Sequence, residues 1–367
     1  MSNRIERVVE KMKQSGVPQM LVTDPCSLWY LTGIYVEPFE RMLALLLRAD
    51  GEHVFFANRL FYIHQDQFRE VQFIDADDSI GMLAEELRKP VADECLNGAD
   101  AKILGIDKAW SARFLIPLQE RCPEFKTILV SDCVDDCRAR KDEEEKELMR
   151  KASQINDIVM ERAAAYVKEG ITEAELAQYI DEEYIKAGAD GNSFPTIVCF
   201  GANAADQHHV PDNTVLKEGD CILIDMGCKW KRYCSDMTRT YFYKTVSPEH
   251  AAIHDLVRSA TEKAESIIKP GVKFCDIDAA ARDMIKEAGY GKNFYTRLGH
   301  FIGQEDHEKG DVSALNMSVA EPGMIFSIEP GVYLDHEFGV RVEDLVLVTE
   351  DGCEILNKVD KNYKILG

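Results

Sequence analysis

Apolar and polar residues alternate with two different periods in the first third of the chain. Ile5, Val8 and Met12 recur at helical spacing among charged residues, which predicts an amphipathic helix at the start. Between residues 20 and 130, short apolar runs typical of strands alternate with helical patterns. The predicted strands are MLVTD, MLALLLRADG, HVFFA and KILGID, and the predicted helices are SIGMLAEELRK and FLIPLQERC. This alternation predicts an α/β domain.

A strongly charged stretch, DDCRARKDEEEKELMRK, interrupts this pattern, and an amphipathic helical period begins at Leu148. Such a change of composition is typical of a domain boundary. We therefore place a boundary near Asp135, between an amino-terminal α/β domain at residues 1–134 and a second domain at residues 135–367. The fold class expected for the whole chain is α/β plus α+β.

The second domain contains an internal repeat. The helical pattern EGITEAELAQYIDEEYIKAG at residues 169–188 returns as PGVKFCDIDAAARDMIKEAG at residues 270–289, an offset of 101. The strand EGDCILIDMG returns as PGMIFSIEPG at an offset of 104, so that Asp225 and Glu329 end equivalent apolar strands. The repeat predicts two similar halves, each of which presents a carboxylate.

A hairpin in the first half is expected to bring a second carboxylate beside the first. If the turn after Asp225 is centred between Trp230 and Lys231, then Asp236 lies directly opposite Asp225. Residues that are opposite one another in an antiparallel pair point to the same face, roughly 5 Å apart. Two like charges would then lie side by side.

The corresponding hairpin in the second half is centred near His336 and places Glu329 opposite Glu343. Four carboxylates converge if the halves pack together, and like charges at close range in a low dielectric repel strongly. Divalent cations are the obvious counter-charge, and an oxygen-rich set with one imidazole suits Mn²⁺, Fe²⁺, Co²⁺ or Zn²⁺. The pattern predicts a dinuclear hydrolase. The alternative is a solvated charge at each strand end, but the symmetric placement favours a metal site.

Composition narrows the possible functions. Lysines and arginines number 43 against 65 aspartates and glutamates, and the net charge of −22 would repel phosphate backbones and anionic lipids. We expect no nucleic-acid partner and no membrane partner, since no run of about 18 apolar residues occurs. The eleven cysteines form no C-x-x-C pair, and without a signal-peptide pattern they indicate a cytoplasmic protein. Cys221, Cys228 and Cys234, beside the acids, match no zinc spacing and are interpreted as core or supporting thiols.

Several motifs of the second domain resemble those of one enzyme family. They are IDMG with SDMTRT, GHFIG with HE following, SIEPGVY and VRVED. Together they resemble the five-ligand signature of the metallopeptidases with the creatinase or aminopeptidase fold, also called the pita-bread fold. Within this family the chain most resembles the two-domain, proline-specific members, prolidase (Xaa-Pro dipeptidase) and aminopeptidase P. The resemblance implies a creatinase-like amino-terminal domain followed by a pseudo-symmetric catalytic domain.

The resemblance also implies a role for each matching residue. Asp236 and Glu343 would bridge two divalent metal ions, and Glu329 would also move the proton of the attacking water. Gly299 and Gly303 would let the backbone pass close to the ions. The expected ions are Mn²⁺ first, with Co²⁺, Zn²⁺ or Fe²⁺ as alternatives. The five implied ligands of the two ions in each subunit are Asp225, Asp236, His300, Glu329 and Glu343.

Other residues would act around the ions. His208, in the segment FGANAADQHHVP, and His307 would hold the scissile carbonyl, whereas His209 receives no role. Arg341 lies on the same strand face as Glu343 and resembles an arginine that braces a ligand carboxylate.

Two tyrosines and three departures from the family pattern complete the expected site. Tyr233 and Tyr333 occupy the positions of tyrosines near the ligands, and ordinary packing is an equal interpretation for both. Phe301 replaces a usual glycine, Gln207 a usual proline and Phe39 a usual histidine. These departures question substrate specificity more than activity, and Phe301 is the first candidate for setting substrate preference.

The segment EPFER, which contains Glu40 and Arg41, resembles a prolidase loop. In related dipeptidases this loop reaches the active site of the neighbouring subunit, which implies a functional homodimer. The expected activity is hydrolysis of the Xaa-Pro bond in small peptides with proline at the second position, with a dipeptidase first and aminopeptidase P, acting on longer peptides, as the alternative. A non-catalytic binding protein on the same scaffold is the remaining alternative, and the presence of all five ligands argues against it.

Overall fold

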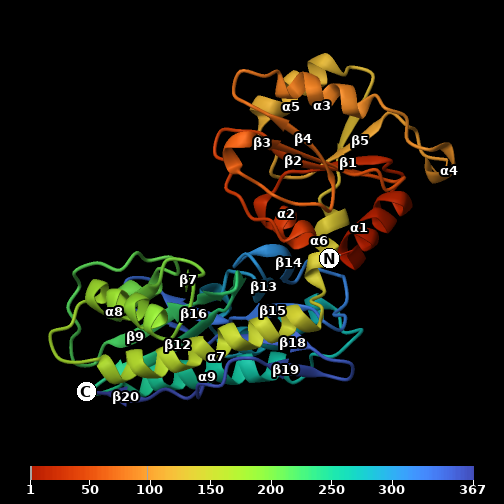
Figure 1. The fold of residues 1–367 in the computed structure, drawn as a ribbon. Helices are drawn as coiled ribbons and strands as arrows, with labels where there is room; N and C mark the ends of the chain where they lie inside the picture. Colours follow the sequence, from red (N-terminus) through yellow and green to blue (C-terminus); the bar gives the residue numbers. More distant parts are fainter. Residues whose placement is uncertain (1, 97) are drawn as a thin grey trace. The chain divides into compact units, whose positions relative to one another are not determined.

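A computed structural model describes residues 2–96 and 98–367, which form two compact units. The first unit ends at Arg138 and the second begins at Ala139 (Figure 1). The boundary expected near Asp135 lies inside helix α6 (Asp132–Ala139), at whose end the units divide. Among the described residues, no helix combines the length and the apolar character needed to cross a membrane.

The first unit is a six-stranded mixed sheet with the strand order β4-β3-β2-β1-β5-β6. Helices α1, α2 and α6 pack on one face and α3 and α5 on the other (Figure 1). The α/β fold expected for this part of the chain is confirmed. In chain order the elements are α1 (Ser2–Gln14), β1 (Gln19–Val22), α2 (Pro25–Thr32), β2 (Leu43–Arg48), β3 (Val54–Asn58), a short 3₁₀ helix (Arg59–Phe61), β4 (Arg69–Phe73), α3 (Ser79–Leu87), α4 (Asp93–Leu96), β5 (Ile103–Ile106), α5 (Ala112–Arg121), β6 (Lys126–Leu129) and α6.

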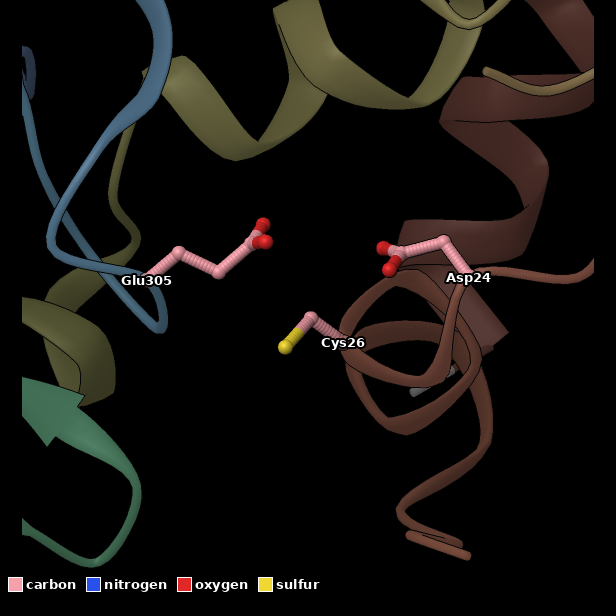
Figure 2. Close-up of side chains that lie close together, drawn as sticks. All are labelled: Asp24, Cys26 and Glu305. Atoms are coloured by element: carbon pink, nitrogen blue, oxygen red, sulfur yellow. The ribbon is translucent and has the colours of Figure 1, made fainter. Parts of the chain in front are cut away.

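Local sequence explains these elements. Every residue of β2 is buried because Leu45 packs with the helices of one face and Leu46 with those of the other, so the strand is apolar throughout. Helix α2 begins where the Asp24 side chain accepts hydrogen bonds from the backbone N–H and the hydroxyl of Ser27, and Cys26 lies in its first turn (Figure 2).

The second unit contains two larger sheets flanked by pairs of helices. Strands β20-β12-β9-β8 form the first sheet and β14-β13-β15-β18-β19 the second, and two smaller sheets, β16-β17 and β11-β10-β7, are also present. The elements are α7 (Glu143–Tyr166), α8 (Glu173–Lys186), β7 (Gly191–Asn192), β8 (Ile197–Phe200), η2 (Gly201–Ala205), β9 (Cys221–Met226), β10 (Cys228–Trp230), β11 (Tyr233–Cys234), β12 (Met237–Tyr243), α9 (Pro248–Glu265), α10 (Phe274–Glu287), η3 (Gly291–Asn293), β13 (Gly299–Phe301), β14 (Glu308–Val312), β15 (Ile325–Ile328), β16 (Gly331–Leu334), β17 (Phe338–Arg341), β18 (Asp344–Val348), β19 (Cys353–Ile355) and β20 (Ile365–Leu366).

The internal repeat of the sequence is also a repeat of structure. Helices α8 and α10 begin and end at positions related by the same offset of 101 residues. Each is followed by a glycine in the left-handed region, Gly188 with φ 89° and Gly289 with φ 95°, where a side chain would be strained. Strand β9 alternates between two cores, with Leu223 packed on the side of α9 and α10 and Ile224 on the side of α7 and α8. The two halves therefore share one continuous framework.

A largely buried cluster of four ionisable side chains supports this framework beside β12 and β18. The Arg239 guanidinium donates to Asp344 at 2.7 Å, and the Lys361 ammonium lies 2.6 Å from the same carboxylate and 3.2 Å from Glu265. Burial, reinforced by the charge of Asp344, raises the pKa of Glu265 to about 8. Two cations thus face two acids, one of which keeps its proton near neutral pH.

This cluster predicts that stability falls as the pH rises from about 6 to about 9. The folded chain holds the Glu265 proton up to about pH 8, whereas the unfolded chain releases it near the ordinary value of 4.5. Between these two pKa values the unfolded chain releases a proton that the folded chain retains. The free energy of unfolding therefore falls as the pH rises toward 8. Relative to E265Q, the wild type should lose on the order of 2 kcal/mol, or roughly 5 °C in Tm, over this range. Thermal denaturation in a chelator measures it.

The control is E262Q, which changes a half-exposed acid on the same helix that pairs with Arg258. Its Tm should follow that of the wild type at every pH. A wild type and E265Q whose Tm values change in parallel would show that Glu265 is already ionised at neutral pH.

Candidate metal centre and active-site cavity

The carboxylates of the first half are arranged differently from the prediction. Strands β9 and β12 pair Asp225 with Thr238, not with Asp236. The hairpin turns at Lys231 and Arg232, which have positive φ values of 46° and 73°, as a two-residue type I′ turn requires. The turn centre is therefore one residue later than expected, and the direct opposition of the two acids is wrong. Because side chains alternate along a strand, Asp225 and Asp236 still point to the same face.

The carboxylates of the second half follow the predicted register. Strands β15 and β18 pair Ile328 with Asp344, and the hairpin beyond them pairs Gly331 with Arg341. Both ladders are centred on His336, which confirms the predicted turn. Glu329 and Glu343, in the gap between the two ladders, therefore lie across from one another.

His300 is held by a close contact between two strands. It lies in β13, where its backbone N–H donates to the hydroxyl of Ser327 on β15 at 3.0 Å. A Cβ on the preceding Gly299 would lie 1.9 Å from the Ser327 carbonyl oxygen. Gly303 lies instead against the carboxylate of Glu308. The glycines were expected to give room beside metal ions, and the structure shows that they give room to neighbouring protein atoms.

The acids and His300 form one group of potential ligands. The His300 Nε2 atom lies 3.3 Å from Asp236 Oδ2 and 3.6 Å from Glu329 Oε1. Asp236, His300 and Glu343 are all buried, and each offers one ligand atom within 4.8 Å of the others. These three residues alone could hold a metal ion, and Glu329 lies at their edge.

The electrostatics of this group favour a cation. Burial, with the charge of Asp225 next, raises the pKa of Asp236 well above its usual range, and burial with the charge of Asp236 does the same for Glu343. Asp225, Asp236 and Glu343 each have one buried carboxylate oxygen that has no hydrogen-bond partner in the described part of the chain. Buried carboxylate oxygens without donors are costly unless a cation binds them. The donor set, oxygens with one imidazole nitrogen, fits a divalent ion such as Mn²⁺.

A chain of hydrogen bonds connects the two halves behind the acids. The Arg341 guanidinium donates to Asp225 at 2.6 Å, to the Tyr333 hydroxyl at 2.9 Å and to the Thr238 hydroxyl at 3.0 Å. Thr238 in turn donates to Glu343 at 2.6 Å. Arg341 thus lies where a bracing arginine would, and Tyr333 contacts it. Sequence reasoning missed Thr238 because the predicted turn centre placed it opposite Leu223, whereas it pairs with Asp225 in the structure.

A cavity of about 540 Å³ lies in front of the acid group. Its lining includes His208 and His307 together with all five predicted ligands. The rings of His300 and His307 lie 4.1 Å apart, and burial with the charge of His300 lowers the pKa of His307 to about 4. Gln207, one of the departures from the family pattern, also lines the cavity. The apolar part of the lining, here called the apolar wall, consists of Phe194, Pro195, Ile197, Val210 and Pro211.

His209 is tied to the protein rather than free to act. Its Nε2 atom lies 2.7 Å from a carboxylate oxygen of Glu173, which is fully buried. Glu173 also accepts a hydrogen bond from the backbone N–H of Phe200 at 2.6 Å and from the Asn203 side chain at 3.0 Å. These contacts hold the loop that carries His208 against helix α8.

Residues 147–350 of the chain match Metallopeptidase family M24, and residues 4–140 match the Creatinase/Prolidase N-terminal domain. The chain belongs to metallopeptidase family M24. The resemblance drawn from the motifs is therefore confirmed, as is the expected pairing of a creatinase-like domain with a pita-bread catalytic domain. The protein is a metallopeptidase, and membership of the family implies divalent metal ions.

Relatives of this M24 metallopeptidase align with it over nearly its whole length. An uncharacterized peptidase of Staphylococcus epidermidis is 34% identical over 366 residues, which is 98% of this chain and 99% of the relative. The crystal structure of a dipeptidase from Pyrococcus horikoshii OT3 superposes with a TM-score of 0.90 at 32% identity, covering 99% of this chain and 100% of that one. A recombinant prolidase from Thermococcus sibiricus gives a TM-score of 0.91 at 30% identity, covering 100% and 99%.

Two predicted site residues of the metallopeptidase lie away from the acid group. Phe301 was the first candidate for substrate preference, but its side chain is in the core, 3% exposed, with its ring 5.4 Å from that of Phe274. It faces away because it follows His300 on a strand, and it does not line the cavity. The Tyr233 hydroxyl donates to Glu145 at 2.7 Å, at the start of α7, and likewise does not line the cavity.

The predicted loop residues of the metallopeptidase belong to its first unit. Arg41 pairs with Glu40 and, at 2.9 Å, with Asp75. Phe39 is 79% exposed and has a positive φ of 50°. In the second unit, Glu305 lies in the loop between β13 and β14, two residues before His307 (Figure 2). The three cysteine thiols beside the acids each donate to a backbone carbonyl, which agrees with core positions.

The contact between β13 and β15 predicts that G299A destabilises the catalytic unit. The added methyl would meet the Ser327 carbonyl and force the strand that carries His300 away from β15. Overpacking of this kind costs about 1–3 kcal/mol. Thermal denaturation in a chelator should show a lower Tm. The control is G352A, since the nearest atom to its new methyl would be 3.9 Å away. An unchanged Tm for G299A would contradict the assigned role of the glycine.

Proposed function

We propose that this metallopeptidase hydrolyses the peptide bond before proline and that dipeptides of the form Xaa-Pro are its main substrates. One observation carries the proposal. The group Asp236, His300 and Glu343 lines one cavity together with His208 and His307, on an M24 scaffold. A small peptide in this cavity would meet metal ligands, histidine donors and an apolar wall together.

We propose that the site holds two divalent ions, with Mn²⁺ first and Co²⁺, Zn²⁺ or Fe²⁺ as alternatives. The buried carboxylate oxygens that lack hydrogen-bond partners support the proposal of two divalent ions. Bound ions would supply Lewis-acid chemistry and lower the pKa of a water molecule beside the scissile bond. Asp236 and Glu343, at the centre of the group, are the candidates for ligands shared by both ions. The proposed ligands are Asp225, Asp236, His300, Glu329 and Glu343.

The residues of the chain then have separate tasks. Glu329 accepts the proton of the attacking water and returns it to the proline nitrogen, and the Ser327 hydroxyl, which donates to it at 3.1 Å, fixes its orientation. Its side chain is 22% exposed, more than those of the other acids of the group, as a group that exchanges protons with a substrate must be. His208 and His307 donate hydrogen bonds to the scissile carbonyl as negative charge develops on it.

The leaving nitrogen of an Xaa-Pro bond belongs to the proline ring, and this explains the need for a dedicated enzyme. An Xaa-Pro amide has no N–H, so a peptidase that hydrogen-bonds that group loses a contact. The apolar wall that includes Phe194 and Pro195 offers the pyrrolidine ring a surface that needs no donor.

We extend the proposal to the domain bounds, the oligomeric state and the cellular compartment of the protein. The amino-terminal domain is assigned to residues 1–134 and the catalytic domain to residues 135–367. The chain forms a homodimer in which the loop of Glu40 and Arg41 serves the neighbouring subunit, and the outward position of Phe39 supports a loop available to a partner. The protein acts in the cytoplasm, a compartment in which its eleven cysteines would stay reduced.

We expect hydrolysis of Ala-Pro to depend on a divalent ion and on Glu329. Protein stripped with a chelator should be inactive and should regain activity with Mn²⁺, because the ligand group needs its cation. E329Q should lower kcat by about 10²–10⁴-fold, the usual contribution of a general acid and base. A discontinuous assay of released proline, with metal content measured on the same samples, checks both results.

The matched control is E337Q, which changes an exposed acid in the hairpin that follows Glu329 and should keep wild-type activity. No hydrolysis of Ala-Pro by fully metallated protein would overturn the proposed substrate. Protein that binds no divalent ion would instead point to a non-catalytic binding role.

A comparison of Ala-Pro with Ala-Pro-Ala separates the two proline-specific activities. A dipeptidase should cleave the tripeptide at least about tenfold more slowly in kcat/KM, a difference of about 1.4 kcal/mol in transition-state stabilisation. Equal or faster cleavage of the tripeptide would identify an aminopeptidase of the aminopeptidase P type.

A further inference from the structure

After strand β19 the chain returns to the acid group. Residues 356–361, which follow β19, are here called the strap. The backbone N–H of Leu356 donates to the Leu345 carbonyl at 2.8 Å, and that of Lys358 donates to both oxygens of Asp157 on α7 at 2.9 and 3.0 Å. Lys361 ends the strap in the buried charge cluster beside Asp344. The strap is thus fixed along its whole length.

Asn357 connects the strap to two segments that carry proposed ligands. It is 3% exposed. Its side-chain oxygen accepts a hydrogen bond from the backbone N–H of Leu345 at 2.7 Å, and its amide nitrogen donates to the backbone carbonyl of Asp236 at 3.1 Å. Leu345 is two residues after Glu343 in the sequence. One buried amide therefore bridges the backbone of Asp236 to the strand that begins beside Glu343.

This bridge crosses between the two halves of the catalytic unit. Asp236 directly precedes β12, in the first sheet, whereas Leu345 lies in β18, in the second. The repeat positions the acids within each half, but it does not by itself determine the separation between halves. Because Asn357 follows the second half of the repeat, it adds a further tie to those that Arg341 and Thr238 make between the halves.

Arg239 makes a parallel connection from the other side. Its guanidinium donates to the backbone carbonyl of Glu343 at 2.6 Å and to that of Thr238 at 2.9 Å. It also donates to the carbonyl of Val359, in the strap, at 2.7 Å. The backbones at both central acids of the group are therefore held by buried side-chain donors, Asn357 at Asp236 and Arg239 at Glu343.

We propose that Asn357 is a positioning residue that sets the spacing between Asp236 and Glu343, and hence the geometry and affinity of the metal centre. The inference rests on the proposed function, since it assumes that these two acids bind metal. A metal site depends on ligand positions held by surrounding hydrogen bonds, and loss of such support typically costs 10–100-fold in affinity. Asn357 supplies that support because its single buried side chain hydrogen-bonds to both segments.

The test compares N357A with D157A, which cuts the strap at Lys358 without touching Asp236 or Leu345. Apo-protein of each variant is titrated with Mn²⁺ against a chromophoric chelator, the visible spectrum of the Co²⁺ form is recorded, and Tm is measured without metal. N357A should bind Mn²⁺ at least about tenfold more weakly and show a changed Co²⁺ spectrum. D157A should lower Tm but keep the wild-type affinity and spectrum.

Three other results overturn the inference in distinguishable ways. N357A with wild-type affinity and spectrum would show that Asn357 does not position the site. Equal losses of metal affinity in N357A and D157A would show that the strap acts only through stability. A wild-type protein that binds neither Mn²⁺ nor Co²⁺ would overturn the proposed metal centre as well.

Discussion

The catalytic unit is organised around the repulsion between carboxylates that the fold brings together in a buried place. Asp225, Asp236 and Glu343 are each at most 9% exposed, and burial and mutual repulsion hold the pKa values of the latter two well above their usual range. Arg341 neutralises part of this charge and Thr238 satisfies one oxygen, yet one oxygen on each acid still lacks a partner among the described residues. A divalent cation bound by these acids would relieve both deficits at once, and its binding would then stabilise the fold of this region.

Duplication explains how such an unfavourable cluster can be built. Each half contributes two acids at the ends of apolar strands. Burial of the apolar strand is favourable, even though burial of the acid is not. Part of the cost arises within the first half, where the charge of Asp225 raises the pKa of Asp236, and part arises where the halves meet. Beside the acids, charged or polar contacts cross from half to half: Arg341 to Asp225, Thr238 to Glu343, and Arg239 to the backbone of Glu343. Hydrogen bonds of this kind have a narrow range of geometry, unlike apolar contacts, and so they can fix the spacing of ligands.

Much of this arrangement could be predicted from the sequence, and the failures have physical causes. The turn at His336 was correct because apolar strands with fixed lengths flank it on both sides. The turn after Asp225 was wrong because Lys231 and Arg232 adopt positive φ without the glycine or asparagine that usually signals it. Strands β4 and β6 were not predicted because both lie at the edges of their sheet, where several of their residues face solvent and no continuous apolar run is needed.

Phe301 shows how a departure from a family pattern can be misread when only the sequence is known. Its neighbour His300 faces the cavity, so Phe301 faces the opposite way, and its ring occupies the space beside Gly310, where a Cβ would come within 2.6 Å of it. The large residue on β13 is thus matched by a glycine on β14. The phenylalanine in place of the usual glycine therefore affects the packing of the hairpin that carries His307. Gln207 is a different case, because it does line the cavity next to His208. Substrate preference is therefore better sought at Gln207 and Val210, which line the cavity, than at Phe301.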